Sequence, residues 1–138
     1  LGISQMAKLD RFVAARADLA ARYAVALRPL TPLVKIAQVS AAATPALHLM
    51  CALIDFAAAG RTRAGVMEAL RARGVGSQVH YIPVHQQPYY RARYGDLDLP
   101  GAQSWYDRCL SLPLYPGMTG DDVDRVAAAL AEALGINR

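Results

Sequence analysis

The stretch GVGSQVHYIPVHQQPYYRARYG, residues 74–95, gathers histidines, tyrosines and glutamines in a chain otherwise rich in alanine and leucine. Histidines can bind a metal, but His80 and His85 stand five residues apart across Pro83. That spacing suits neither ligation from one helix face nor the tight pairs of zinc sites, so no metal site is predicted. Two interpretations stay open. The amides and hydroxyls could recognise a polar ligand such as a sugar, or the stretch could be a proline-stiffened loop packed on the core.

Covalent catalysis finds little support in the sequence. Neither Cys51 nor Cys109 neighbours a histidine, and their wide separation indicates two small buried apolar residues rather than a disulfide. The only lysines are Lys8 and Lys35, and GVGSQ is too short for a dinucleotide-binding loop. No catalytic residue is therefore predicted within this chain.

Length and composition predict one domain over residues 1–138, because 54% hydrophobic residues are ample for one core. The apolar runs fall short of the roughly 20 residues that a membrane span needs, and the N-terminus has no pattern of a secretory leader. We expect a cytoplasmic protein without a membrane partner. The net charge of +4 comes from scattered arginines, so nucleic acid is not an expected partner either.

The hydrophobic pattern predicts a small α/β layer structure, with a mixed or antiparallel sheet and helices packed mainly on one side. The nearly continuous apolar residues 48–56 predict a strand buried on both faces. The last helix is the clearest, since Thr119 is a good N-cap and Asp122 stands where a capping box needs an acid. The predicted helices are 4–27, 62–73, 102–110 and 119–135; the predicted strands are 33–39, 48–56, 75–84 and 110–114; residues 88–100 are predicted as a loop.

Four motifs occur in an order that resembles the C-terminal part of the PLP-dependent sugar-nucleotide aminotransferases of the DegT/DnrJ/StrS type. They are LGISQMAKLDRFVAARADLAARYAVAL, HLMCALIDF, RARGVGSQVHYIPVHQQPYYR and CLSLPLYPGMTGDDVDRVAAALAEAL. Within them, QVHYIPVHQQPYY is similar to the branch that aminates UDP-linked 4-keto-6-deoxy-N-acetylhexosamines, as in the altrosamine transaminases of pseudaminic acid synthesis.

This resemblance implies the small C-terminal domain of a type I aminotransferase fold. It also implies pyridoxal 5'-phosphate (PLP) as cofactor, a UDP-keto-sugar and glutamate as substrates, and a homodimer. The family's cofactor-binding lysine and aspartate precede the matched region, so this chain alone is expected to bind no PLP and to be inactive. A start at LGISQ without methionine agrees with a piece of a longer enzyme. The resemblance implies that the substrate-lining residues are Gln78, Val79, His80 and Tyr81, with His85 close behind.

A second interpretation of the whole chain is also open. A stand-alone binding or assembly module could retain this small-domain fold and perform no chemistry. The sequence does not distinguish that module from the substrate-side domain of an aminotransferase of surface-polysaccharide or pseudaminic-acid-type glycan synthesis.

Overall fold

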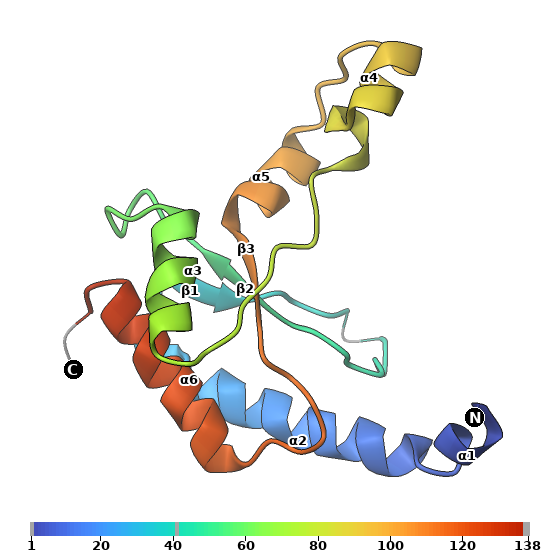
Figure 1. Ribbon diagram of the computed structural model, residues 1–138, viewed down its shortest axis with the longest axis vertical. Coiled ribbons are helices and arrows are strands. Elements are labelled where there is room, and N and C mark those ends of the chain that lie inside the picture. The colour runs from blue at the N-terminus through green and yellow to red at the C-terminus, as the bar shows by residue number, and fades with distance from the viewer. Residues whose placement is uncertain (1, 41, 137–138) are drawn as a thin grey trace.

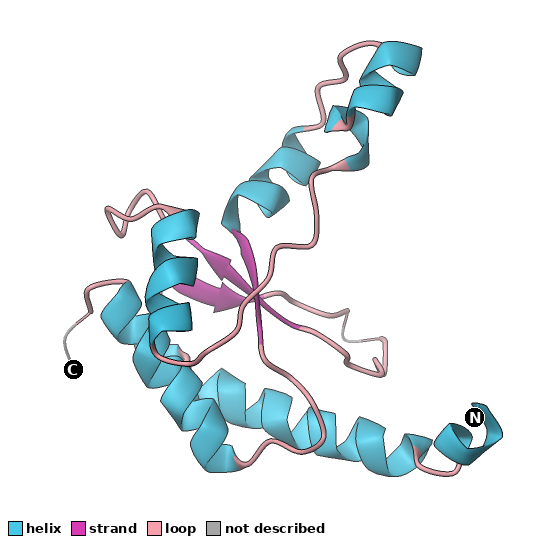
Figure 2. Cartoon of the chain, viewed as in Figure 1, coloured by secondary structure: helices cyan, strands magenta, loops and turns pink. Residues whose placement is uncertain are grey.

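The computed structural model describes residues 2–40 and 42–136 as a small α/β domain with one helical projection (Figure 1). Helices make up most of its regular structure, and the strands are short (Figure 2). In chain order the elements are α1 (Gly2–Met6), α2 (Leu9–Ala26), the 3-10 turn η1 (Arg28–Leu30), β1 (Val34–Ile36), β2 (Met50–Ile54), α3 (Arg63–Ala72), the 3-10 turn η2 (Val84–Gln86), α4 (Pro88–Tyr94), α5 (Pro100–Arg108), β3 (Cys109–Leu112) and α6 (Gly120–Ala133).

The described strands form a three-stranded antiparallel sheet in the order β1-β2-β3. Ala52 in the central strand pairs with Ile36 on one side and with Leu110 on the other. Of the two predicted sheet types, the antiparallel one is therefore confirmed. The observed strands are shorter than the predicted segments 33–39, 48–56 and 110–114.

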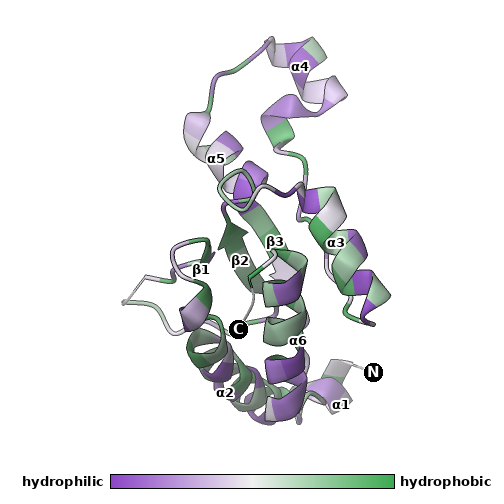
Figure 3. Cartoon of the chain, turned by 90° about the vertical axis from the view of Figure 1, so that its left-hand side faces the viewer, coloured by the Kyte–Doolittle hydropathy of each residue, from purple (hydrophilic) through white to green (hydrophobic). Residues whose placement is uncertain are grey.

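The two faces of the sheet differ in burial. Along β2, Met50, Ala52 and Ile54 are buried, whereas Cys51 and Leu53 are half-buried. The prediction of a strand buried on both faces was wrong, because α3 and α6 lie on the same side of the sheet and leave the other face uncovered by helices (Figure 3). The predicted placement of the helices mainly on one side is confirmed.

The C-terminal helix α6 is built as its sequence predicts. The Thr119 hydroxyl accepts the amide of Asp122 at 3.2 Å, and the Asp122 carboxylate accepts the amide of Thr119 at 2.9 Å, which completes the capping box. The apolar face of the helix is buried, with Leu130 fully enclosed. At the predicted boundary of the earlier helix, Thr62 caps α3 by accepting the amide of Gly65.

Helix α2 packs against α6. It also holds the segment that leads from β3 to α6. Its Tyr23 side chain is fully buried, and the phenol donates a hydrogen bond to the Pro113 carbonyl at 2.9 Å. Burial raises the pKa of this phenol above its ordinary value. The predicted single helix 4–27 is divided into α1 and α2 by a turn at residues 7–8. None of the α1 residues is buried, so tertiary packing does not support a continuous helix there.

None of the helices within residues 2–40 and 42–136 is both long enough and apolar enough to cross a lipid bilayer.

Candidate functional site

The first half of the polar stretch runs beside β3 as an extended segment. Gln78 and Ser111 exchange both backbone hydrogen bonds, at 3.1 and 2.8 Å. The prediction of a strand over residues 75–84 was wrong, because the pairing consists of this one bridge. In an antiparallel ladder the next bonded partners on β3 are Pro113 and Cys109. Pro113 has no amide, and the Cys109 amide already donates to the Trp105 carbonyl at the end of α5.

Side chains fix the same segment further. His80 Nδ1 lies 2.8 Å from the Ser111 hydroxyl, and the His80 and Tyr81 rings meet edge to face at 5.0 Å. His80 is half-buried, whereas Tyr81 is 71% exposed. The segment therefore holds its histidine against the sheet and presents its tyrosine to solvent.

The second half of the stretch opens an arm that comprises η2, α4 and α5 and projects from the rest of the molecule (Figure 1). The prediction of a loop over residues 88–100 was wrong for its first half. Pro88 stands at the start of α4, where its fixed φ suits a helix and its missing amide costs nothing. Gly95, with φ of +76°, ends that helix. Pro88 and Gly95 thus bracket a short helix.

Aromatic side chains gather on α4. The rings of Tyr90 and Tyr94 stack four residues apart, with centroids at 6.5 Å and planes inclined by 13°. The Arg93 guanidinium donates to the Tyr89 hydroxyl at 3.0 Å. A hydrogen bond from Gln86 to Gln103 connects η2 with α5. At the base of the arm, the Arg63 guanidinium of α3 donates a hydrogen bond to the Tyr106 carbonyl of α5, which connects the arm to the rest of the molecule.

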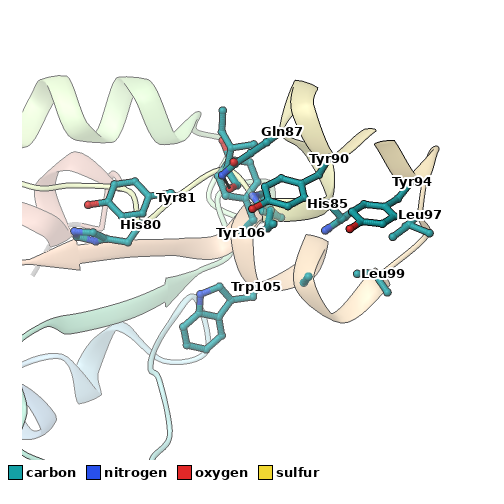
Figure 4. A pocket seen from close by; sticks show the side chains of 14 residues that line it. His80, Tyr81, His85, Gln87, Tyr90, Tyr94, Leu97, Leu99, Trp105 and Tyr106 are labelled. Atoms are coloured by element: carbon teal, nitrogen blue, oxygen red, sulfur yellow. Dashed lines mark hydrogen bonds between the residues drawn. The ribbon is translucent and has the colours of Figure 1, made fainter. Parts of the chain in front are cut away.

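A cavity of about 620 Å³, here called the arm cavity, lies between the segment that follows His80 and the inner side of the arm (Figure 4). Three of the five predicted site residues line it: His80, Tyr81 and His85. Gln78 and Val79 do not. Val79 packs against the core, and the Gln78 side chain accepts the Val79 amide at 2.9 Å. For all five residues, contact with the substrate stays a prediction.

Most of the arm cavity comes from residues that the sequence interpretation did not select. Apart from Gln87, they share an apolar or aromatic side chain on or next to the arm's helices. The spacing of Tyr90 and Tyr94 by one helical turn was the available signal, but it needed α4 to be recognised as a helix. These additional lining residues are Ile82, Pro83, Val84, Gln87, Tyr90, Tyr94, Leu97, Leu99, Ala102, Trp105 and Tyr106.

The chemical character of the arm cavity follows from this lining. Imidazole, phenol and amide groups can exchange hydrogen bonds with hydroxyl and carbonyl oxygens, and the rings can cover an apolar face. None of the described residues that line it carries a carboxylate, an ammonium or a guanidinium group. Arg91 lies in the adjoining hollow with His85, and it is paired with Asp96 at 2.7 Å. The cavity suits a neutral, hydroxyl-rich ligand portion.

A second hollow, the sheet groove, lies over the uncovered part of the sheet beside the end of α2, and has a volume of about 910 Å³. Lys35 and Arg28 line it among apolar side chains, together with Cys51 and Trp105, and Trp105 also lines the arm cavity.

Both cysteines are free. Cys109 is buried as predicted, but Cys51 is only half-buried, so the prediction of a buried residue was wrong for Cys51. Burial raises the pKa of the Cys51 thiol.

The sequence resemblance implies PLP as the cofactor, and neither hollow offers the groups that hold it. PLP enzymes combine a lysine for the covalent link with an acidic partner for the pyridine nitrogen. Among the described lining residues, the sheet groove has Lys35 but no carboxylate, and the arm cavity has neither group. The residues present here do not fit the cofactor by themselves.

Over residues 2–40 and 42–136, no group of three or more His, Cys, Asp and Glu side chains is placed to hold a metal ion. His48 is exposed and lines neither hollow.

Comparison with solved structures places this fold among sugar aminotransferases. The chain matches DesI, solved in the presence of its TDP-sugar product, with a TM-score of 0.89 and 27% identity, over 99% of this chain and 35% of that one. It also matches Helicobacter pylori PseC, an aminotransferase of pseudaminic acid biosynthesis, with a TM-score of 0.87 and 22% identity over 97% of this chain and 36% of that one. The small three-stranded α/β domain corresponds to the C-terminal part of such structures.

The sequence comparison is consistent with the structural one. The DegT/DnrJ/EryC1/StrS aminotransferase family matches residues 1–131, and the chain belongs to this family. Among its relatives, the spore coat polysaccharide biosynthesis protein SpsC of Bacillus subtilis (strain 168) is 38% identical over 135 residues. That match covers 96% of this chain and 34% of SpsC, so the chain spans about a third of the length of this relative. The family is PLP-dependent.

Proposed function

We propose that this chain is the substrate-side domain of a PLP-dependent aminotransferase that aminates a UDP-linked 4-keto-6-deoxy-N-acetylhexosamine. The amino group of glutamate replaces the sugar's keto oxygen, which leaves 2-oxoglutarate and a 4-amino sugar nucleotide. The product serves surface-polysaccharide or pseudaminic-acid-type glycan synthesis in the cytoplasm. In this proposal the arm cavity receives the hexose.

The observation that carries the proposal is the pairing of polar and aromatic groups in the arm cavity. His80 and Tyr81 offer hydrogen-bonding groups from the extended segment, and Tyr90 and Tyr94 offer ring faces from the arm. A deoxyhexose has polar hydroxyl and N-acetyl groups beside an apolar methyl-bearing face, and such a surface needs both kinds of partner. The product complex of DesI with a TDP-sugar, and the polysaccharide pathway of SpsC, support a sugar nucleotide as the substrate class.

The cofactor is assigned to a part of the enzyme outside this domain. PLP supplies the electron sink that amino transfer requires. We expect no covalent PLP on the isolated chain, because Lys35 lines the sheet groove without a carboxylate and Lys8 is exposed. Incubation with PLP, borohydride reduction and mass spectrometry measure this. Specific stoichiometric labelling of either lysine, or aminotransferase activity of the isolated chain, would contradict the assignment. The active enzyme is proposed to be a homodimer.

The binding test uses the isotopically labelled 138-residue chain and NMR titration. We expect saturable shifts around His80, Tyr81 and His85 on addition of the UDP-linked 4-amino-4,6-dideoxy-N-acetylhexosamine product. UDP alone should shift the arm cavity signals much less, since the hexose is assigned to that cavity. A TDP-linked counterpart shows whether the chain distinguishes the two nucleotides.

Two outcomes would count against the proposal. Equal shifts with UDP and with the UDP-sugar would remove the hexose from the arm cavity. Absence of any shift, together with an intact mass showing that the native product is this chain alone, would favour a non-catalytic binding or assembly module.

A further inference from the structure

Ser111 is the one buried polar residue among those that the structure describes, with 7% of its surface exposed. It lies on β3 opposite Cys51, in a strand whose neighbours Leu110 and Leu112 belong to the apolar core. A buried polar side chain in such a place needs a hydrogen-bond partner. Its partner is Nδ1 of His80, at 2.8 Å.

The contact has a direction that follows from the inventory of donors. A serine hydroxyl carries one hydrogen to donate, and a neutral imidazole has one nitrogen that donates and one that accepts. Within the described part of the chain, the Ser111 hydroxyl contacts no acceptor other than His80 Nδ1. If Nδ1 carried the proton, the serine hydrogen would be buried without an acceptor, which is the costlier arrangement. The arrangement that satisfies both groups is one in which the hydroxyl donates to Nδ1 and the imidazole proton resides on Nε2.

We propose that Ser111 is a positioning residue that holds His80 in its Nε2–H tautomer, so that the ring offers an N–H donor to an oxygen acceptor of the ligand. His80 lines the arm cavity (Figure 4), and no hydrogen bond of Nε2 occurs within the described residues. Two backbone bonds between Ser111 and Gln78 anchor the same segment, so one residue of β3 fixes both the backbone and the ring. The role in ligand binding rests on the proposed function above.

The preferred acceptor is a neutral oxygen, such as the N-acetyl carbonyl or a hydroxyl of the hexose. When Nδ1 of a neutral imidazole accepts the serine hydrogen bond, the Nε2–H is the group that can face the ligand. That N–H favours a hydrogen-bond acceptor on the ligand and disfavours a donor at the same position. Ser111 thereby influences substrate selection without touching the substrate itself.

The tautomer can be measured directly, without a ligand. The 138-residue chain is labelled with ¹⁵N-histidine and kept at a pH at which histidine side chains are neutral. Two-bond ¹H–¹⁵N correlation spectra then distinguish protonated from unprotonated ring nitrogens. We expect His80 to show a fully protonated Nε2 and an unprotonated Nδ1, while the exposed His48 shows the averaged signals of a free ring. A His80 that is averaged like His48, or protonated at Nδ1, would overturn the proposal.

Two variants separate positioning from mere packing. Ser111→Ala should give His80 averaged ring signals and weaken binding of the UDP-amino sugar by between about twofold and tenfold, the loss of one hydrogen bond. Ser111→Thr keeps a hydroxyl and should restore both readouts. If Ser111→Ala does not fold, the spectra of the wild type and of Ser111→Thr still test whether His80 is held in the Nε2–H tautomer, because each spectrum reports the tautomer on its own. Retention of a single Nε2–H tautomer in a folded Ser111→Ala variant would overturn the role of the hydroxyl.

The tautomer test and the binding test fail in different ways. An averaged His80 in the free chain contradicts the positioning role whatever the ligand does. A fixed tautomer in a chain that binds no sugar nucleotide contradicts the proposed function, and with it the use of this donor for substrate.

Discussion

The body of the molecule, made of α2, α3, α6 and the sheet, and the projecting arm use apolar side chains in opposite ways. In the body, Leu130, Leu70 and Ile54 are completely buried. In the arm, Leu97 remains 50% exposed and Tyr94 61% exposed. Burial of apolar surface is the main favourable term in folding, so the body stabilises itself, whereas the arm leaves much of its apolar surface exposed.

The largest expected effect lies at the centre of the body. Leu130→Ala should lower the free energy of unfolding by about 2 to 5 kcal/mol, because it leaves a cavity in a fully buried site. Urea denaturation followed by circular dichroism measures the change. An unchanged denaturation midpoint would mean that α6 does not dock on the sheet as described.

A smaller effect is expected where α6 begins. Thr119→Ala removes the hydroxyl that accepts the Asp122 amide at 3.2 Å, and should cost about 1 kcal/mol of stability. The same denaturation experiment measures it. Thr119→Ser, which keeps the hydroxyl, is the matched control and should stay close to the wild type. Equal losses in the two variants would show that the hydroxyl does not cap the helix.

The same capping box makes a pH-dependent contribution. The backbone amide of Thr119, followed by its hydroxyl, lowers the pKa of the Asp122 carboxyl below its ordinary value of 3.8. A carboxyl whose pKa is lowered by folding stabilises the protein above its unfolded pKa, and this contribution is lost as the pH falls through the folded pKa. Stability should therefore decline below about pH 3.8. Asp122→Asn should reduce that decline; an identical pH dependence in both proteins would refute the assignment.

The smallest expected effect lies in the arm. Leu97→Ala should change the free energy of unfolding by no more than about 0.5 kcal/mol, since half of this side chain is already in solvent. The ratio between the losses for Leu130→Ala and Leu97→Ala quantifies the contrast between body and arm. Similar losses for the two variants would remove that contrast.

The features that the sequence predicted depend on local signals, and the features that it missed depend on tertiary contacts. The helix α6, its cap at Thr119 and the helix α3 were predictable because caps and apolar periodicity are local signals. The strand β2 was located, but its burial was not, because whether a face is covered depends on helices far away in sequence. The split between α1 and α2 was missed for a related reason: the apolar pattern continues through residues that contact no core.

The candidate site could be predicted from the sequence only in part. His80, Tyr81 and His85 were selected from residue type and family resemblance, and all three line the arm cavity. The strand predicted over residues 75–84, which contains His80 and Tyr81, is absent because Pro113 and the helix-bonded Cys109 amide cannot extend the pairing. Ser111 gave no sequence signal, since a lone serine in LSLPL becomes informative only when β3 brings it beside His80.

The central claim is that the arm cavity binds the hexose of a sugar nucleotide through His80. The most direct measurement compares the affinity of the UDP-linked 4-amino-4,6-dideoxy-N-acetylhexosamine for wild type, His80→Ala and His48→Ala by isothermal titration calorimetry. His48→Ala is the matched control, because this exposed histidine lines neither hollow. We predict an affinity between about twofold and tenfold weaker for His80→Ala and an unchanged affinity for His48→Ala. Equal affinities of wild type and a folded His80→Ala variant would contradict the claim.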